Sequence, residues 1–358
     1  MDLACALVFA VVGSAAATPE GLALVGGRVL VEDGRVVPRT VHVRAGRIRA
    51  VDARPAEADE RAIDVSGAVL APGVIDSHVH LAFGDPALEL AGGLAAVVDL
   101  GSPAGLLEGA ALAPLGVVYA GPIVTAPGGY PTRGWGRDGF GLEVESAADV
   151  VRAVEAMHAR GARVLKLAIE PQSGPTLSAA TMASGARAAH ARGMRVGAHA
   201  LRASSVRSAL AAGADFLAHT PLERLPEDLV RAFCSRPDAA VVSTLGAFGA
   251  RAAAIDNLRR MRKGGCIVLY GTDLGNGVGE GIQAGELAAL AKAGLSAREI
   301  LEAATRAPAA YFGLRELGAI APGRAASLLA LDADPTMDAG ALGRRRLVVA
   351  GGAVVVSR

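Results

Sequence analysis

The sequence is poor in aromatic residues and cysteines, and both shortages restrict what it can build. Aromatic side chains make up only 3% of the 358 residues, so the core must be made mainly of Ala, Val, Leu and Ile. The three cysteines, Cys5, Cys234 and Cys266, include no C-x-x-C pair, which argues against a cysteine zinc site. Cys234 and Cys266 could pair, but we expect two separate small core residues.

Charge of either sign is not in excess, and lysine is scarce. The formal net charge is +1, which gives no electrostatic case for binding nucleic acid or an anionic membrane. We therefore expect a small-molecule partner, and a homo-oligomer is compatible with the sequence. Lysine occurs only at Lys166, Lys263 and Lys292. A position that keeps lysine in such an arginine-rich chain is one where arginine would not serve.

The chain begins with a short apolar run. Residues 3–17 are apolar and then small, and Thr18-Pro19 follows. The run is too short to span a bilayer and resembles the core of an export signal with an A-x-A cleavage site. Its start departs from that pattern, because it has no Lys or Arg and carries Asp2. We expect residues 1–17 to be a signal peptide and the protein to be periplasmic or secreted, with a cytoplasmic location as the alternative.

The two ends of the remaining chain share a β-rich texture. Alternating apolar segments such as Val41–Arg44 and Ile48–Val51 are separated by glycine turns, and Leu347–Val356 has the same character. Such segments predict short strands joined by tight turns. We expect residues 18–70 and 315–358 to combine into one small β-sandwich domain that flanks the segment between them.

The middle of the chain, residues 71–314, alternates strand and helix patterns. Several helical stretches end at a glycine just before an apolar strand, as at Gly161, Gly193 and Gly213. The pattern predicts an α/β fold, a (β/α)8 TIM barrel that forms the catalytic domain. A doubly wound sheet is the alternative, but no G-x-G-x-x-G follows a first strand. The eight predicted strands are Val69–Asp76, Ala96–Leu100, Val117–Ala120, Arg163–Ile169, Arg195–Ala200, Asp215–His219, Ala240–Thr244 and Ile267–Gly271.

Three of the seven histidines are interpreted as structural. His42 lies in the N-terminal β-rich segment. His158 and His190 fall in matching last turns of predicted helices, where an imidazole can face the carbonyl end of the helix dipole.

The other four histidines and one aspartate follow predicted barrel strands. His78 and His80 are two residues apart, so in an extended segment their side chains point the same way. His199, His219 and Asp273 end or follow three later strands, where a barrel places its active site. Imidazole and carboxylate groups bind Zn²⁺ and similar ions. These positions therefore predict a metal centre.

Lys166 stands in the apolar strand segment Val164–Ala168. A buried lysine is costly unless it is neutral or paired. A neutral amine can react with CO₂ to give a carbamate, whose two oxygens can bridge two metals. The alternative is a structural ion pair with Glu170 or a contact to a substrate group.

The ordered motifs APGVIDSHVH, VLKLAIE, VGAHA, FLAHTPL and YGTDLG resemble the amidohydrolase superfamily. Within it the chain is most similar to the imidazolonepropionase-like group, which includes prolidase-like members. The resemblance implies that His78, His80 and Asp273 hold one divalent metal ion, that His199 and His219 hold a second, and that carbamylated Lys166 bridges them. It implies Zn²⁺ as the metal and Asp273 as the catalytic proton carrier.

The resemblance also implies a reaction. We expect hydrolysis of an amide C–N bond, in a cyclic amide or a peptide-like substrate, by metal-activated hydroxide. An Xaa-Pro or Xaa-Arg dipeptidase is one alternative, a mononuclear heterocycle deaminase is another, and a non-catalytic binding scaffold is a third. The long segment 126–137 holds Tyr130, Arg133, Trp135 and Arg137, which could line a substrate pocket, although a solvated loop explains them equally well.

Overall fold

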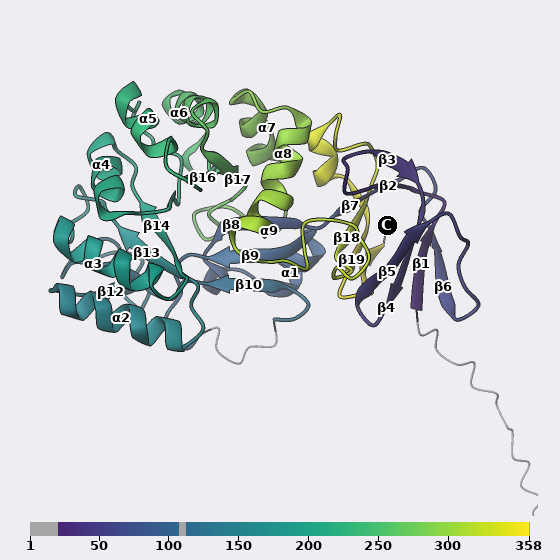
Figure 1. Ribbon diagram of the computed structural model, residues 1–358, viewed down its shortest axis with the longest axis horizontal. Coiled ribbons are helices and arrows are strands. Elements are labelled where there is room, and N and C mark those ends of the chain that lie inside the picture. The colour runs from purple at the N-terminus through teal and green to yellow at the C-terminus, as the bar shows by residue number, and fades with distance from the viewer. Residues whose placement is uncertain (1–20, 107–111, 358) are drawn as a thin grey trace, which may run out of the picture.

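The computed structural model describes residues 21–106 and 112–357. An α/β body occupies most of the molecule, and a β-rich region formed by both ends of the described chain lies beside it (Figure 1). The predicted signal peptide, residues 1–17, lies outside the described residues. Among the residues that are described, no helix has the length and apolar character needed to cross a bilayer.

Parallel strands form the centre of the α/β body in two hydrogen-bonded sheets. One sheet has the order β10-β9-β8 and the other the order β12-β11-β13-β14-β15-β16-β17. The strands are β8 (Val74–Val79), β9 (Leu94–Asp99), β10 (Gly116–Tyr119), β11 (Ile123–Thr125), β12 (Gly141–Glu143), β13 (Val164–Ala168), β14 (Arg195–His199), β15 (Phe216–Leu217), β16 (Ala240–Val242) and β17 (Ile267–Leu269).

Hydrogen bonds join the two sheets into a TIM-barrel-like ring. The Ser77 amide donates to the Tyr270 carbonyl at 2.8 Å, and the Asp273 amide donates to the His78 carbonyl at 2.8 Å. These bonds connect β8 to the segment that continues β17, so the first and last strands of the barrel are neighbours. The α/β barrel expected from the sequence is therefore present.

The third barrel strand is broken, which the sequence patterns did not predict. β10 pairs with β9, whereas β11 pairs with β13, and only residues 120–122 separate them. Gly121 has a φ of +80°, and Pro122 has no N–H to donate to a neighbouring strand. The predicted segment Val117–Ala120 therefore covers only the first half of this barrel position.

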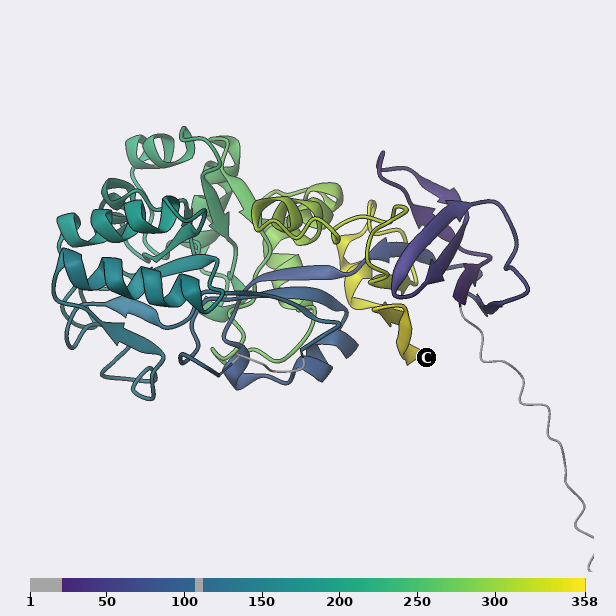
Figure 2. The ribbon, with the colours of Figure 1, turned by 60° about the horizontal axis from the view of Figure 1, so that its bottom comes forward.

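Helices surround the strands on the outside of the barrel (Figures 1 and 2). The predicted glycine stops after three of them are confirmed, because Gly161, Gly193 and Gly213 all have positive φ. The helices are α1 (Pro86–Ala91), α2 (Ala147–Ala159), α3 (Ala179–His190), α4 (Ala203–Ala212), α5 (Glu227–Cys234), α6 (Ala252–Lys263), α7 (Ala284–Lys292), α8 (Ala297–Ala304) and α9 (Arg306–Tyr311), with 3-10 turns η1 (Leu81–Phe83), η2 (Gly246–Phe248) and η3 (Ala339–Gly343).

The two ends of the described chain meet in two further sheets, of order β5-β4-β1-β6 and β20-β19-β18-β7-β2-β3. N-terminal β7 pairs antiparallel with C-terminal β18. One apolar cluster contains Leu22 and Leu24 from one end and Leu328 and Val349 from the other. The strands are β1 (Gly21–Val25), β2 (Arg28–Leu30), β3 (Val36–Pro38), β4 (Thr40–Arg44), β5 (Arg47–Asp52), β6 (Glu60–Asp64), β7 (Val69–Pro72), β18 (Leu328–Leu331), β19 (Arg345–Ala350) and β20 (Ala353–Ser357).

The three histidines interpreted as structural lie away from the barrel mouth. His42 is buried in β4, with Nδ1 2.8 Å from a Glu60 oxygen. His158 and His190 occupy the last turns of α2 and α3, as predicted.

Cys234 and Cys266 form a disulfide, so the expectation of two separate thiols is wrong. α5 ends at Cys234, and after α6 the chain returns to begin β17 just beyond Cys266. The 32-residue excursion brings the two Cα atoms to 4.7 Å. Sequence spacing carries no information on this return, because it depends on how α5 and α6 pack.

Candidate active site

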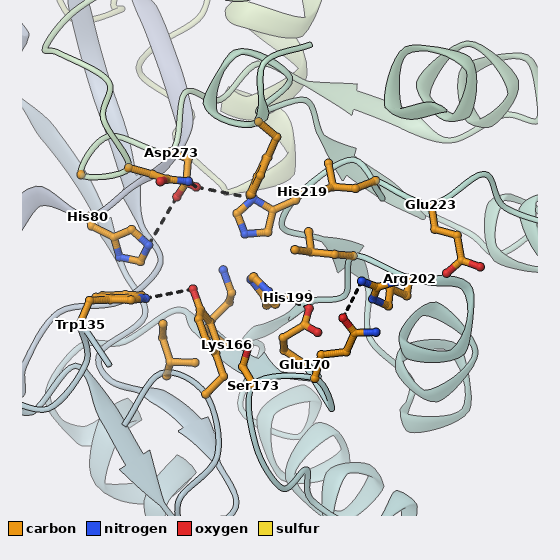
Figure 3. Close-up of a pocket in the computed structure, with 18 of the residues that line it drawn as sticks. His80, Trp135, Lys166, Glu170, Ser173, His199, Arg202, His219, Glu223 and Asp273 are labelled. Atoms are coloured by element: carbon orange, nitrogen blue, oxygen red, sulfur yellow. Dashed lines mark hydrogen bonds and ion pairs between the residues drawn. The ribbon is translucent and has the colours of Figure 1, made fainter. Parts of the chain in front are cut away.

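All six predicted metal ligands meet at the carboxyl ends of the barrel strands. Figure 3 shows five of them, from His80 to Asp273, around one cavity. The ligands lie within, end or follow β8, β13, β14, β15 and β17, and all are buried. The residues that the structure brings together are His78, His80, Lys166, His199, His219 and Asp273.

His78 and His80 point the same ring nitrogen at Asp273. The Nδ1 of His78 lies 2.7 Å from the Ala218 carbonyl, and the Nδ1 of His80 lies 2.9 Å from the Gly101 carbonyl. A carbonyl oxygen can only accept, so each Nδ1 carries the proton and, in the neutral ring, each Nε2 presents a lone pair. The two Nε2 atoms lie 3.3 and 3.5 Å from Oδ1 of Asp273.

This arrangement fits a metal cation. Two lone pairs and a carboxylate oxygen converge, and the ligand atoms of the three residues all lie within 4.8 Å of one another. Burial, more than the neighbouring Lys166, lowers the pKa of His78 well below its usual value, which keeps the ring neutral and able to ligate. Neutral imidazoles oriented by backbone carbonyls are typical of metal sites.

A second group of donors lies next to the first, because the His219 ring is 4.5 Å from the His78 ring. The rings of His199 and His219 are 4.8 Å apart, and burial is the main cause that lowers the pKa of both. The Nδ1 of His219 is 3.1 Å from the Thr244 hydroxyl and 3.9 Å from Oδ2 of Asp273. Asp273 therefore stands between the two groups of histidines.

Lys166 is fully enclosed between these groups. Its Nζ lies 3.5 Å from Nε2 of His78. Burial lowers the pKa of Lys166 to about 7, against the opposing charges of Asp273 and Asp99. The alternative pairing with Glu170 is not what the structure shows, because the Glu170 carboxylate lies 3.6 Å from His199 instead. A lysine that loses its proton so readily has the chemistry that a carbamate requires.

Buried aspartate Asp76 supports the first group, and sequence reasoning missed it. Its Oδ1 accepts from the backbone amides of His78 and Thr272 at 3.0 and 3.1 Å, and its Oδ2 accepts from the Thr272 hydroxyl at 2.6 Å. It thus ties β8 to the residue before Asp273. Its position two residues before His78, directly after the apolar residues Val74 and Ile75, was the available signal.

The cavity above these residues has a volume of about 780 Å³. Tyr130 and Trp135 line it, as predicted. Arg133 does not line it, and Arg137 donates to the Arg133 carbonyl at 3.1 Å, so the structure gives no support to a substrate role for Arg133. Sequence reasoning assigned no substrate role to several other lining residues, which are Phe83, Gln172, Ser173, Arg202, Glu223, Phe248, Arg251 and Asn276.

Comparison with known proteins identifies the family. The model of the Amidohydrolase family matches residues 90–355. The chain belongs to this family. Its members hydrolyse carbon–nitrogen bonds in a metal-dependent reaction, so the chain is an enzyme of that general type. His78, His80 and Asp273 at the barrel mouth could hold a metal ion. No curated protein sequence matches the chain.

Several solved structures share the fold across most of the chain. A putative prolidase from Bifidobacterium longum is 24% identical with a TM-score of 0.78, covering 95% of this chain and 96% of its own. A prolidase complexed with N-methylphosphonate-L-proline is 22% identical with a TM-score of 0.77, covering 94% and 100%. An ochratoxinase of A. niger is 18% identical with a TM-score of 0.77, covering 95% and 96%. At these sequence identities, the structural similarity establishes that this chain shares their fold and nothing further about its activity.

Proposed function

We propose that this amidohydrolase cleaves an amide bond of a small peptide-like or cyclic molecule with two divalent metal ions, Zn²⁺ being the ion that the donor set suits. The observation that carries the proposal is the convergence of the His78 and His80 lone pairs on the Asp273 carboxylate beside a second pair of histidines. His78, His80 and Asp273 would hold one ion, and His199 and His219 the other.

Lys166 would complete the centre as a carbamate. Its neutral amine forms an N–C bond to CO₂ and releases one proton, which leaves an anionic group with two oxygens. Its Nζ lies beside His78, and its charge also acts on His199 and His219, which supports this role. Arginine could not react in this way, because it does not deprotonate at working pH.

When bound, the ions supply Lewis acidity and an acidified water. Asp273 then carries the proton. Its Oδ1 faces His78 and His80, whereas its Oδ2 accepts from Asn276 Nδ2 at 3.1 Å. Oδ2 is therefore the atom that takes a proton from water and returns it to the leaving nitrogen, as a general base and then a general acid.

An Xaa-Pro or Xaa-Arg dipeptidase is the second candidate. Solved relatives of the same fold include prolidases and an Xaa-Pro dipeptidase with bound methionine, which supports peptide-like substrates. A mononuclear heterocycle deaminase fits less well. A single metal ion needs no bridging group, so this function would leave the buried lysine beside the ligands unexplained.

We also propose that the protein works in an oxidising compartment, outside the cytoplasm. The Cys234–Cys266 disulfide supports this location, because disulfides persist in such compartments. We further propose that the two sheets at the chain ends form the small sandwich domain. β7 belongs to one of these sheets, and Gly73 connects it to the start of β8.

The experiment that tests the centre is metal stoichiometry. We expect two ions per chain in the purified protein, a lower count in Lys166→Ala, and recovery when that variant receives bicarbonate or a short-chain carboxylate. Lys263→Ala, at an exposed lysine of α6, is the matched control and should keep two ions. One ion per chain, unchanged by Lys166→Ala, would overturn the bridged centre.

A further inference from the structure

The walls of the cavity differ in chemistry. On one side stand Phe83, Tyr130 and Trp135, with Phe140 stacked behind Phe83 at 4.9 Å. The Trp135 ring lies 4.9 Å from the His80 ring. Figure 3 shows Trp135 on the His80 side and Arg202 and Glu223 on the opposite side, with the metal ligands between.

The aromatic wall is apolar surface kept in contact with solvent. The chain has only one Trp, four Tyr and seven Phe, yet Phe83 and Trp135 are left 48% and 39% exposed. The Trp135 Nε1 donates to the Tyr130 hydroxyl at 3.0 Å, so its one polar hydrogen is already used. What the wall offers a ligand is therefore mainly aromatic faces, which suit a flat or bulky apolar group.

The opposite wall is charged, and several of its side chains are held by neighbouring groups. The Arg202 guanidinium donates to Gln172 Oε1 at 2.6 Å. Glu170 lies beside His199, and Glu223 accepts from the Ala203 amide at 3.2 Å. These contacts hold the side chains of Arg202 and Glu223 in place without neutralising their charges, because their partners are neutral.

Arg251 differs from Arg202 in that its side chain is not held by a neighbouring group in the described part of the chain. It lines the cavity and directly precedes α6. Within residues 21–106 and 112–357, its guanidinium has no ion pair or hydrogen bond. An arginine without a partner at the edge of a binding cavity can meet a carboxylate with two parallel hydrogen bonds.

The segment that leads to Arg251 is held in place from behind. The carboxylate of buried Glu286 accepts from the amides of Leu245 and Gly246 at 3.0 and 2.6 Å. The Ala250 amide then donates back to the Leu245 carbonyl at 2.7 Å. The backbone of Arg251 is thus fixed at the cavity edge before any ligand arrives, which reduces the entropy lost on binding.

Building on the proposed hydrolase, we propose that the substrate is an N-acyl amino acid with an aromatic or bulky apolar acyl group. The acyl group lies against the Phe83–Trp135 wall, the amide lies over the metal ligands, and the carboxylate of the leaving amino acid meets Arg251. In an N-acyl amino acid, the carboxylate is on the nitrogen side of the amide bond. The leaving amino acid therefore faces Arg251, and the acyl group faces the aromatic wall.

Binding of an uncleavable analogue tests the proposal without requiring turnover. The probes are an N-benzylsulfonyl amino acid, its C-terminal amide, and the N-methylsulfonyl counterpart, titrated calorimetrically into the full metal-loaded chain. We expect the free carboxylate to bind at least tenfold more tightly than its amide, and Arg251→Gln to reduce this preference to less than threefold. Trp135→Ala should likewise remove a tenfold preference for benzyl over methyl.

Matched controls are Arg207→Gln, an exposed arginine of α4, and Met337→Ala, an exposed apolar residue. Both should keep the preferences of the wild type. Equal binding of acid and amide by the wild type, or preferences unchanged in Arg251→Gln and Trp135→Ala, would overturn the inference. Hydrolysis of phenylacetyl amino acids is measured separately, so selective binding without turnover would count against the hydrolase alone.

Discussion

Asp273 is the residue on which both proposed roles, ligand and proton carrier, converge. Its backbone has a φ of +60°, a left-handed conformation that few residues other than Gly, Asn and Asp adopt. Strain of this kind costs about 1–3 kcal/mol and concentrates at functional sites. The conformation turns the side chain back over His78 and His80, which lie on the neighbouring segment.

We predict that Asp273→Asn lowers kcat by about 10²–10⁴-fold, the range that general acid–base groups contribute. Asparagine tolerates the same φ and keeps an oxygen for the ligand position, so most of the metal should remain. The measurement is kcat together with metal content. Asp238→Asn is the control, because Asp238 also has a positive φ, of +57°, outside the cavity lining. Wild-type kcat in Asp273→Asn would assign the proton transfer to another group.

At the scale of single residues, the positions of the six candidate metal ligands and of Tyr130 and Trp135 could be predicted, whereas that of Arg251 could not. His199 and Asp273 are visible in sequence because each follows an apolar strand, and barrel strands all end at the same face. Eight residues separate the end of β16 from Arg251. Its position depends on the Glu286 contacts, which link segments about forty residues apart, and local patterns do not encode such contacts.

At the scale of secondary structure, the disulfide links the end of α5 to the start of β17 across a 32-residue separation. Closing a loop of this length restricts the unfolded chain and stabilises the fold by about 2–4 kcal/mol. We therefore predict that reductant lowers the free energy of unfolding by that amount in urea titrations. The Cys234→Ser/Cys266→Ser variant should show the lower stability and no response to reductant. An equal response of both proteins to reductant would contradict the prediction.

Helix α1 contains a buried carboxylate whose titration should be measurable. Glu89 accepts from the Gly281 amide at 2.7 Å, and burial raises its pKa from 4.5 to about 7. The folded chain therefore keeps this proton up to about pH 7, whereas the unfolded chain releases it near pH 4.5. The contribution of Glu89 to the free energy of unfolding is consequently largest in acid and falls as pH rises between these two values.

We predict that Glu89→Gln removes the part of the pH-dependent decrease in the free energy of unfolding that Glu89 causes. The measurement is the difference in unfolding free energy between wild type and variant from pH 4 to pH 8, which cancels the titration of other groups. The difference should decline up to about pH 7 and then level off. Glu155→Gln, at an exposed position of α2, should give a flat difference. A flat difference for Glu89→Gln would show that Glu89 is already ionised in acid.

The elements themselves were largely predictable, and the exceptions have physical causes. Each predicted barrel strand overlaps an observed one, because fully buried parallel strands have continuous apolar sequences. The first prediction, Val69–Asp76, joins β7 to the start of β8. The exception is the third position, where Gly121 and Pro122 split the strand and β11 was overlooked. Its three residues carry too little periodicity to stand out from the loop that follows.

At the scale of the whole molecule, the sheet formed by the chain ends is joined directly to the strand that carries the first candidate metal ligand. β7 pairs with C-terminal β18 and, after Gly73, continues directly into β8, which carries His78. The first ligand strand therefore starts from a sheet that needs both ends of the chain. The β-rich texture shared by the two ends predicted that they would meet, and the pairing of β7 with β18 confirms it.

Bound metal should therefore stabilise the entire fold, and the dependence on its concentration should count the ions. A ligand that binds only the folded state adds RT ln(1 + [L]/Kd) to the free energy of unfolding. Above saturation, each tenfold rise in free Zn²⁺ adds about 1.4 kcal/mol for one ion and about 2.7 kcal/mol for two. We predict the larger slope for the wild type in urea titrations at buffered Zn²⁺, and a slope near the smaller value for Lys166→Ala.

Chelation should lower stability and abolish turnover together, and both should return on adding Zn²⁺. A slope of one ion in the wild type would leave a single metal at His78, His80 and Asp273, with Lys166 free to contact substrate.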